Sequence, residues 1–192
     1  MFQIRLHGRG GQGVVSGAEM LSVAAFLEGR YAQAFPSFGS ERMGAPVMAF
    51  CRIDDKEIRL REPVLEPDAL IVQDPTLLHQ VDLFSGLKPH GRVLINSTRS
   101  FAELGLTGLT HGARAFQLTS LPATELALKH VGRAVPNAAL LGGFAAVTGL
   151  IALASVLAAI RQKFPEPIAE KNVGAAKEAF DLAVKAVEVA HA

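Results

Sequence analysis

Residues 2–27, FQIRLHGRGGQGVVSGAEMLSVAAFL, decide the fold. A short apolar segment, 2–6, precedes a cluster of glycines, and a long alanine- and leucine-rich stretch follows them. Apolar residues recur at helical spacing over 14–27, and Gly29 marks the end of that helix. The order strand, glycine turn, helix predicts the opening unit of an α/β fold.

The glycine cluster predicts a site for an anion. Gly8, Gly10 and Gly13 satisfy the pattern G-x-G-x-x-G, in which a tight turn brings backbone N–H groups close to a phosphate. The following helix would present the positive end of its dipole and its unpaired N–H groups to the same anion. Arg9 and Gln12 could add a charge and an amide. A glycine turn also occurs where a strand merely folds back onto a helix, so the motif alone leaves both interpretations open.

An ordinary NAD site is disfavoured. Such a site carries an Asp or Glu roughly 20 residues after the glycines, at the end of the second strand, where it holds the ribose hydroxyls. The second strand is predicted at 31–35, and it continues into Pro36, Ser37 and Phe38. Glu28 comes too early, at the end of the first helix.

The composition fits one globular domain. The chain has 192 residues, of which 49% are hydrophobic and 19% charged, and its formal net charge is +1. This charge leaves no basic stripe for nucleic acid. The single cysteine, Cys51, excludes an internal disulfide and a cluster held by this chain's cysteines, and its apolar surroundings predict a buried, unreactive thiol. With scattered histidines and no secretory signal, we expect a cytoplasmic protein without a bound metal.

The uncharged stretch 138–160 is long enough to span a bilayer. It is rich in glycine and alanine, however, and no aromatic belt accompanies it. We predict a buried helix or pair of helices, packed in the core or against a partner subunit, and no membrane span.

The remaining elements alternate between strand and helix patterns. Strands are predicted at 47–53 and 57–61, joined by a turn at Asp54 and Asp55, and then at 69–73, 92–95 and 115–118. Helices are predicted from about 76, over 123–130, over 137–164 with a break near Gly149, and over 174–190. The prediction is a single α/β domain over 1–192. It has a Rossmann-like, mostly parallel sheet flanked by helices and a helical C-terminal part.

Three segments follow predicted strand ends and are expected to converge on one site, because ligands of such folds lie beyond the carboxyl ends of the strands. They are the glycine turn 8–13, the loop 36–45 and the pair Asn96–Ser97. In the loop, Arg42 could direct two donors at phosphate oxygens, although with Glu41 it could equally form a solvated surface pair. Asp74 precedes Pro75, which favours a helix N-cap over a ligand contact.

Several separated stretches together resemble a known family. They are GRGGQGVV (8–15), YAQAFPSFGSERMGAPV (31–47), EPDALIVQDPTLL (66–78), Asn96–Ser97, NAALLGGFAAVTGL (137–150) and EKNVGA (170–175). In this order, and over almost the whole chain, they resemble the gamma subunit of 2-oxoacid:ferredoxin (or other acceptor) oxidoreductases of the pyruvate synthase and phenylglyoxylate dehydrogenase type. Agreement of several motifs makes this resemblance more specific than the glycine turn alone.

The resemblance implies a place in a multisubunit enzyme. Such enzymes convert a 2-oxo acid, such as pyruvate or phenylglyoxylate, and coenzyme A into an acyl-CoA and carbon dioxide. The electrons pass to ferredoxin, or to NAD through another subunit. Thiamine diphosphate with Mg and iron–sulfur clusters is implied on the alpha, beta and ferredoxin-like delta subunits. The gamma subunit is implied to serve coenzyme A, so this chain is expected to hold no catalytic residue.

Motifs and resemblance together nominate a set of coenzyme A-binding residues. Backbone N–H groups of the turn and Arg42 would hold phosphate, and Ser37, Asn96 and Asn137 would bond the adenosine or pantetheine part. The full set is Gly8, Arg9, Gly10, Gly11, Gln12, Gly13, Ser37, Phe38, Gly39, Arg42, Gly44, Asn96, Ser97 and Asn137. The alternatives are a stand-alone dinucleotide-binding Rossmann protein or sensor, and a scaffold whose turn binds nothing.

Overall fold

A computed structural model describes residues 1–37, 43–112 and 115–190. The strands are β1 (Phe2–Arg9), β2 (Tyr31–Pro36), β3 (Pro46–Asp54), β4 (Ala69–Val72), β5 (Arg92–Asn96) and β6 (Gln117–Leu121). The α-helices are α1 (Val14–Leu27), α2 (Ala123–Val131), α3 (Asn137–Thr148), α4 (Leu153–Lys163) and α5 (Ile168–Ala190). Two short 3-10 helices, η1 (Pro75–His79) and η2 (Thr107–Leu109), lie between strands.

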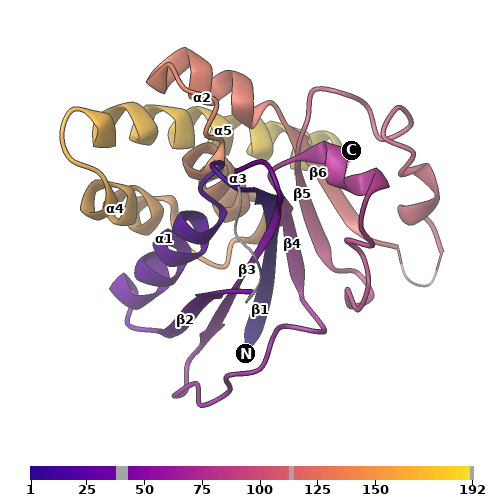
Figure 1. The fold of residues 1–192 in the computed structure, drawn as a ribbon, viewed down its shortest axis with the longest axis horizontal. Helices are drawn as coiled ribbons and strands as arrows, with labels where there is room; N and C mark the ends of the chain where they lie inside the picture. Colours follow the sequence, from indigo (N-terminus) through magenta and orange to yellow (C-terminus); the bar gives the residue numbers. More distant parts are fainter. Residues whose placement is uncertain (38–42, 113–114, 191–192) are drawn as a thin grey trace.

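The six strands form one sheet in the order β2-β3-β1-β4-β5-β6 (Figure 1). Strands β1, β4, β5 and β6 are parallel neighbours, as their continuous apolar runs predict. Strand β3 is antiparallel to both β1 and β2. The predicted α/β class and mostly parallel sheet are therefore confirmed, with one reversed strand inside the sheet.

The helices lie on one face of the sheet (Figure 1). All five α-helices of the described residues contribute to the larger core, which includes Ile4 and Leu6 of β1 and Leu94 of β5. On the opposite face, Leu70 and Val93 belong to a smaller core built from the segment between β4 and β6. That face is covered by turns and short 3-10 helices rather than by α-helices.

Small residues let α3 and α5 pack closely. A Cβ on Gly142 would lie 2.0 Å from the carbonyl oxygen of Ala176, so only glycine fits at this crossing. The chain breaks between α3 and α4 at Gly149, which has φ of 59°. The uncharged stretch 138–160 is thus a pair of helices, and most of α3 is buried in the core of this chain. Among the described residues, none of the helices is long and apolar enough to cross a membrane.

Three predicted elements were wrong or displaced. Residues 57–61 are not a strand: the alternation of charged and apolar residues there suits a strand, but β1 and β2 occupy both edges of β3, so the predicted partner is not free. Helix α5 begins at Ile168, and Gly174 lies inside it, where a Cβ would be 2.8 Å from Nδ1 of His130. Strand β6 begins two residues later than the prediction and extends to Leu121.

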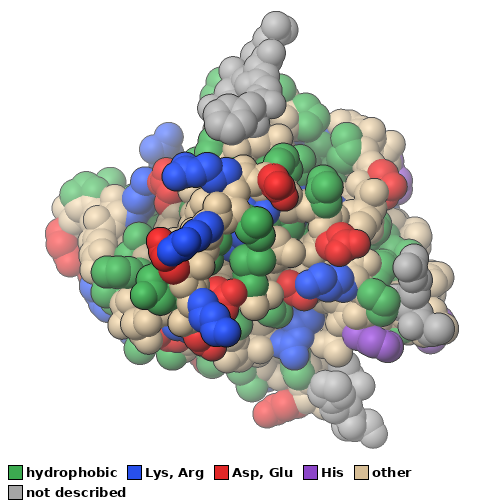
Figure 2. All heavy atoms as spheres, turned by 90° about the horizontal axis from the view of Figure 1, so that it is seen from below, with side chains coloured by type: hydrophobic (Ala, Val, Ile, Leu, Met, Phe, Trp, Pro, Cys, Tyr) green, Lys and Arg blue, Asp and Glu red, His purple; other side chains and the backbone are tan. Residues whose placement is uncertain are grey.

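Charges are mixed on the molecular surface. On the face drawn in Figure 2, basic and acidic side chains lie interspersed among hydrophobic ones. Some of the described charges are paired, as in the partly buried ion pair Lys88–Asp68, with 2.7 Å between Nζ and Oδ1.

Candidate functional site

The glycine turn lies at the carboxyl end of β1, beside the start of β3. Gly8 and Arg9 are register partners of Val47 and Pro46. The N–H of Gly10 donates to the Ala45 carbonyl at 2.9 Å, and the Gly10 carbonyl accepts from the Gly44 N–H at 3.1 Å. Residues 43–45, at the end of the loop between β2 and β3, are therefore fastened onto the turn, and the predicted convergence of these two segments is confirmed.

The glycines of the motif meet different steric demands. A Cβ on Gly8 would lie 2.7 Å from Cγ2 of Val14, so the strand and the helix approach too closely for a side chain. Gly11 and Gly13 have φ of 92° and 72°, a left-handed conformation that side chains disfavour. Gly13 is also the N-cap residue of α1.

The side chain of Asn137, the first residue of α3, is hydrogen-bonded to the glycine turn. Its Nδ2 donates to the Gly13 carbonyl at 3.2 Å, and its Oδ1 accepts from the Ala138 N–H at 2.8 Å. The side chain is buried, and a Cβ on Gly13 would lie 2.5 Å from Nδ2. Asn137 is therefore placed to fix the turn, and its amide is already committed to protein groups.

The first turn of α1 offers free donors. No side chain caps this helix, and the N–H groups of Val14, Val15 and Ser16 have no protein acceptor within the described residues. The first main-chain hydrogen bond of the helix is made by Gly17, whose N–H donates to the carbonyl oxygen of Gly13 at 2.9 Å. Unpaired N–H groups at the positive end of a helix dipole form a suitable site for an anion.

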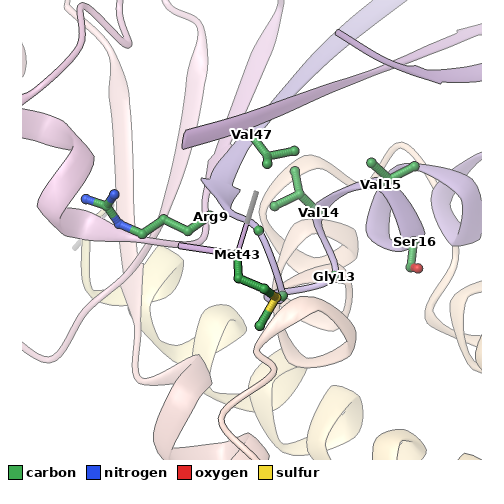
Figure 3. Close-up of a pocket in the computed structure, with 9 residues that line it drawn as sticks. Arg9, Gly13, Val14, Val15, Ser16, Met43 and Val47 are labelled. Atoms are coloured by element: carbon green, nitrogen blue, oxygen red, sulfur yellow. The ribbon is translucent and has the colours of Figure 1, made fainter. Parts of the chain in front are cut away.

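These donors open onto a cavity of about 320 Å³. Its lining residues are Arg9, Gly10, Gly11, Gly13, Val14, Val15, Ser16, Met43 and Val47. In Figure 3, Met43 lies beside the turn while the Arg9 side chain extends away from it. Met43 is 85% exposed. The cavity thus joins a polar floor of main-chain N–H groups to apolar walls.

The Arg9 side chain contacts protein groups in this structure. Its Nε lies 3.2 Å from Oδ2 of Asp74, and its Nη2 donates to Oγ1 of Thr76 at 2.7 Å and to Oε1 of Gln80 at 2.9 Å. Gln12 also contacts Asp74, with its Nε2 donating to Oδ2 at 2.8 Å. Both side chains thus link the turn to η1 and the residues beside it, and the ligand contacts expected of them stay predictions.

Asp74 is the centre of this network. It caps η1 by accepting from the Thr76 N–H at 3.0 Å, so the predicted N-cap role is confirmed. Burial raises the pKa of Asp74, but the hydrogen bonds from Thr76 and Gln12 and the charge of Arg9 outweigh that effect. The net result is a pKa below the ordinary value, so the carboxylate is ionised. The sequence gives no signal for its second role, because Arg9 and Gln12 are distant in the chain.

The other expected site residues are dispersed. Asn96 is buried, and its Nδ2 donates to the Gln73 carbonyl at 2.8 Å while its Oδ1 accepts from the Thr124 N–H at 3.0 Å. Ser97 accepts from the Arg99 N–H at 3.0 Å. Neither lines the cavity beside the glycine turn. Asn96 therefore ties the end of β4 to α2, and its expected ligand role stays a prediction.

The loop residues are only partly placed. The N–H of Ser37 donates to the Met48 carbonyl at 2.8 Å, so this residue continues the edge of the sheet beyond β2. Gly44 has φ of 77° and follows Met43 at the turn. Phe38, Gly39, Glu41 and Arg42 lie outside the described residues, and their expected roles stay predictions. Sequence reasoning missed Ser16 and Met43, although both follow or face the glycine motif.

Two titratable groups elsewhere are inert. Cys51 is fully buried in β3, and burial raises the pKa of its thiol, as the apolar run predicted. His7 is buried on β1, where its Nε2 accepts from Nε of Arg5 at 3.0 Å. Burial and the charge of Arg5 lower the pKa of His7 to about 3. Among the described residues, no group of three His, Cys, Asp or Glu is placed to hold a metal.

Comparison with known proteins settles the family. A model of the pyruvate ferredoxin/flavodoxin oxidoreductase family matches residues 3–182. The chain belongs to this family. The resemblance to a gamma subunit is thereby confirmed, and this family member is a subunit of an oxidoreductase.

Individual relatives align with this chain over nearly their full lengths. The Pyrococcus abyssi pyruvate/ketoisovalerate oxidoreductases common subunit gamma is 48% identical over 181 residues, which are 94% of this chain and 96% of the relative. Pyruvate synthase subunit PorC of Methanothermobacter marburgensis is 46% identical over 94% of this chain and 97% of its own. The crystal structure of the Thermotoga maritima pyruvate oxidoreductase subunit PorC matches with a TM-score of 0.80 and 35% identity, covering 94% and 95% of the two chains.

A more distant structure shares the fold alone. The 2-oxoglutarate:ferredoxin oxidoreductase of Magnetococcus marinus matches this chain with a TM-score of 0.70 and 16% identity. The match covers 96% of this chain but 31% of that one. The same architecture thus occurs as one part of a longer polypeptide.

Proposed function

We propose that this chain is the coenzyme A-positioning subunit of a multisubunit 2-oxoacid:ferredoxin oxidoreductase. The reaction converts a 2-oxo acid and coenzyme A into an acyl-CoA and carbon dioxide. Thiamine diphosphate on the alpha and beta subunits would supply the carbon–carbon cleavage, and iron–sulfur clusters there and on a delta subunit would carry the electrons. The names of the relatives favour pyruvate over an aryl glyoxylate as the 2-oxo acid.

One observation carries the proposal: the first-turn N–H groups of α1 meet no acceptor in the part of the chain that the structure describes, and they open onto a cavity. Unpaired N–H groups at the positive end of a helix dipole attract negative charge, so an anion that accepts from Val14, Val15 and Ser16 fits this position. The diphosphate of coenzyme A has the required charge and acceptor oxygens. The apolar walls formed by Met43 and Val47 suit the less polar parts of the same molecule.

The role assigned to this chain is positioning. The turn would hold one end of coenzyme A while the thiol reaches the partner subunit. Fixing a reactant beside the group it attacks raises its effective concentration greatly. Within the described residues, the cavity lining provides no acid or base for proton transfer, which suits a binding role.

Ser16→Glu tests the proposal. A carboxylate in the first turn of α1 is favoured by the helix dipole, so the variant should fold. It would face bound phosphate at close range, and the KM for coenzyme A of the intact complex should rise at least about tenfold. Pyruvate-dependent exchange of carbon dioxide, which the partner subunits carry, should be unchanged.

Ser22→Glu is the matched control, because Ser22 lies on the same helix away from the cavity. Its KM should stay within about twofold of the wild type. An unchanged KM for a folded Ser16→Glu complex would exclude coenzyme A from the turn. Binding of NADH rather than coenzyme A by the wild-type complex would favour the dinucleotide-binding alternative.

A further inference from the structure

The outer edge of β6 presents unpaired main-chain groups. β6 is the last strand of the sheet, and within the described residues no strand pairs with its outer side. The N–H of Gln117 donates to Gly91, and the carbonyl of Leu121 accepts from Ser97. Because alternate residues of a parallel strand bond to the same neighbour, Leu118 and Ser120 direct their N–H and C=O groups away from β5.

This edge lines a cavity of about 810 Å³, separate from the glycine turn. The C-terminal part of α5 forms one wall, beside β6 (Figure 1). Its other apolar walls come from residues such as Phe101, Phe116 and Val147. A cavity with apolar walls and an open strand edge suits an extended polypeptide, whose main chain can pair with the edge while its side chains fill the space.

The two charged side chains that line the cavity, Arg92 and Lys185, are both basic. Thr119 is 8% exposed, and its hydroxyl makes no hydrogen bond among the described residues. Lys185 is exposed on α5. Arg92 donates from Nη1 to the Val147 carbonyl at 2.6 Å, and its other N–H groups have no acceptor among the described residues. The described lining residues include no Asp or Glu. Such a set is complementary to a carboxylate.

We propose that the cavity receives an extended acidic segment of another subunit of the same complex, added as a strand along β6. The main-chain groups of Leu118 and Ser120 would pair with the segment, and a carboxylate of the segment would approach Lys185 and Thr119. A free carboxylic acid of low molecular weight would use the cations but leave the strand edge unpaired. The inference uses the family's subunit character and does not depend on where coenzyme A binds.

Ser120→Pro is the decisive variant. Proline removes the outward N–H and leaves the ladder to β5 intact, and edge strands tolerate it at such a position. We expect the affinity of this chain for the remaining subunits, measured by native mass spectrometry over a dilution series, to fall at least about fivefold. Ser120→Ala keeps the N–H and should leave the affinity unchanged.

Charge reversal supplies a variant that does not touch the strand. Lys185→Glu should also weaken assembly about fivefold or more, because it would repel the acidic segment. Lys171→Glu, at an exposed position of α5 outside the cavity lining, should have no effect. Melting curves of the free chain should match the wild type for both lysine variants, which separates loss of binding from loss of folding.

Two readouts locate the partner. Hydrogen exchange at the Leu118 and Ser120 amides should be slower in the complex than in the full chain alone. A carbodiimide, which joins a lysine to a carboxylate in contact, should link Lys185 to an Asp or Glu of another subunit. Equal exchange in both states, a link only to a second copy of this chain, or normal assembly of Ser120→Pro and Lys185→Glu would overturn the proposal.

Discussion

The side-chain amide of Asn137 donates a hydrogen bond to the carbonyl oxygen of Gly13, which precedes it by 124 residues. The bond joins the first residue of α3 to Gly13, the N-cap residue of α1, which has a left-handed conformation. Since Gly13 directs the first-turn N–H groups of α1, the geometry of the candidate site depends on the C-terminal half of the chain.

Asn137→Ala should loosen the glycine turn. The change leaves the Gly13 carbonyl with the Gly17 N–H as its one remaining described donor and removes the acceptor of the Ala138 N–H, so the free energy of unfolding should fall by about 1–3 kcal/mol. Hydrogen exchange at the amides of residues 13–17 should speed up. Asn172 is the control: it is buried too, and its Nδ2 donates to the Ile168 carbonyl within α5. Asn172→Ala should cost similar stability without faster exchange in the turn.

Asp74→Asn should uncouple the turn from η1. The variant removes the charge that Arg9 faces, and hydrogen bonds to charged groups contribute about 1.5–3 kcal/mol. Because the folded-state pKa of Asp74 is lowered, this stability is present above its ordinary pKa of 3.8 and is lost as pH falls below it. Urea unfolding should separate wild type and variant at pH 7 and bring them together in acid. Asp55→Asn, at an exposed ion pair, should change stability by less than about 0.5 kcal/mol.

Gly142→Ala should destabilise the crossing of α3 and α5. Its Cβ would meet the main chain of Ala176, which cannot move aside as a side chain can, and overpacking costs roughly 1–3 kcal/mol. Gly108→Ala is the control, since a Cβ there meets nothing within 4 Å and its φ is not left-handed. Thermal unfolding of the two variants should differ clearly. A Gly142→Ala protein as stable as wild type would contradict the close approach.

His7 should make the protein sensitive to mild acid. Burial and Arg5 lower its pKa from 6.5 to about 3, so the unfolded chain binds a proton in this range and the folded protein does not. Stability from this group is therefore present above pH 6.5 and falls by about 1.4 kcal/mol per pH unit as pH drops toward 3. His7→Gln should flatten the pH dependence of unfolding between pH 6 and pH 4. An equal slope in both proteins would show that other groups control it.

Local patterns predicted most of the fold because they report local physics. The apolar runs at 69–73 and 92–95 are buried on both faces, and the helical spacing at 14–27 gives α1 with the predicted bounds. Pairing partners are not encoded locally, so the reversal of β3 and the absence of a strand at 57–61 could not be predicted. The sequence predicts that the last helix begins at Gly174, whereas Gly174 lies inside α5 and its small size leaves room for the His130 ring.

The candidate site was predicted in outline for the same reason. The steric need for glycine at 8, 11 and 13 follows from a strand that turns into a helix. The partners of Arg9, Asn96 and Asn137 come from distant segments, and a polar side chain in a motif looks the same whether it meets a ligand or the protein.

The reversed direction of β3 has a consequence for how this protein can vary. Because β3 runs against β2, the chain leaves one strand and enters its neighbour at the same rim, without a crossover helix. Insertions between residues 37 and 43 would lengthen a hairpin connection and leave the sheet register as it is. The length of this connection can therefore change among related subunits while the glycine turn is held fixed by the packing of the core.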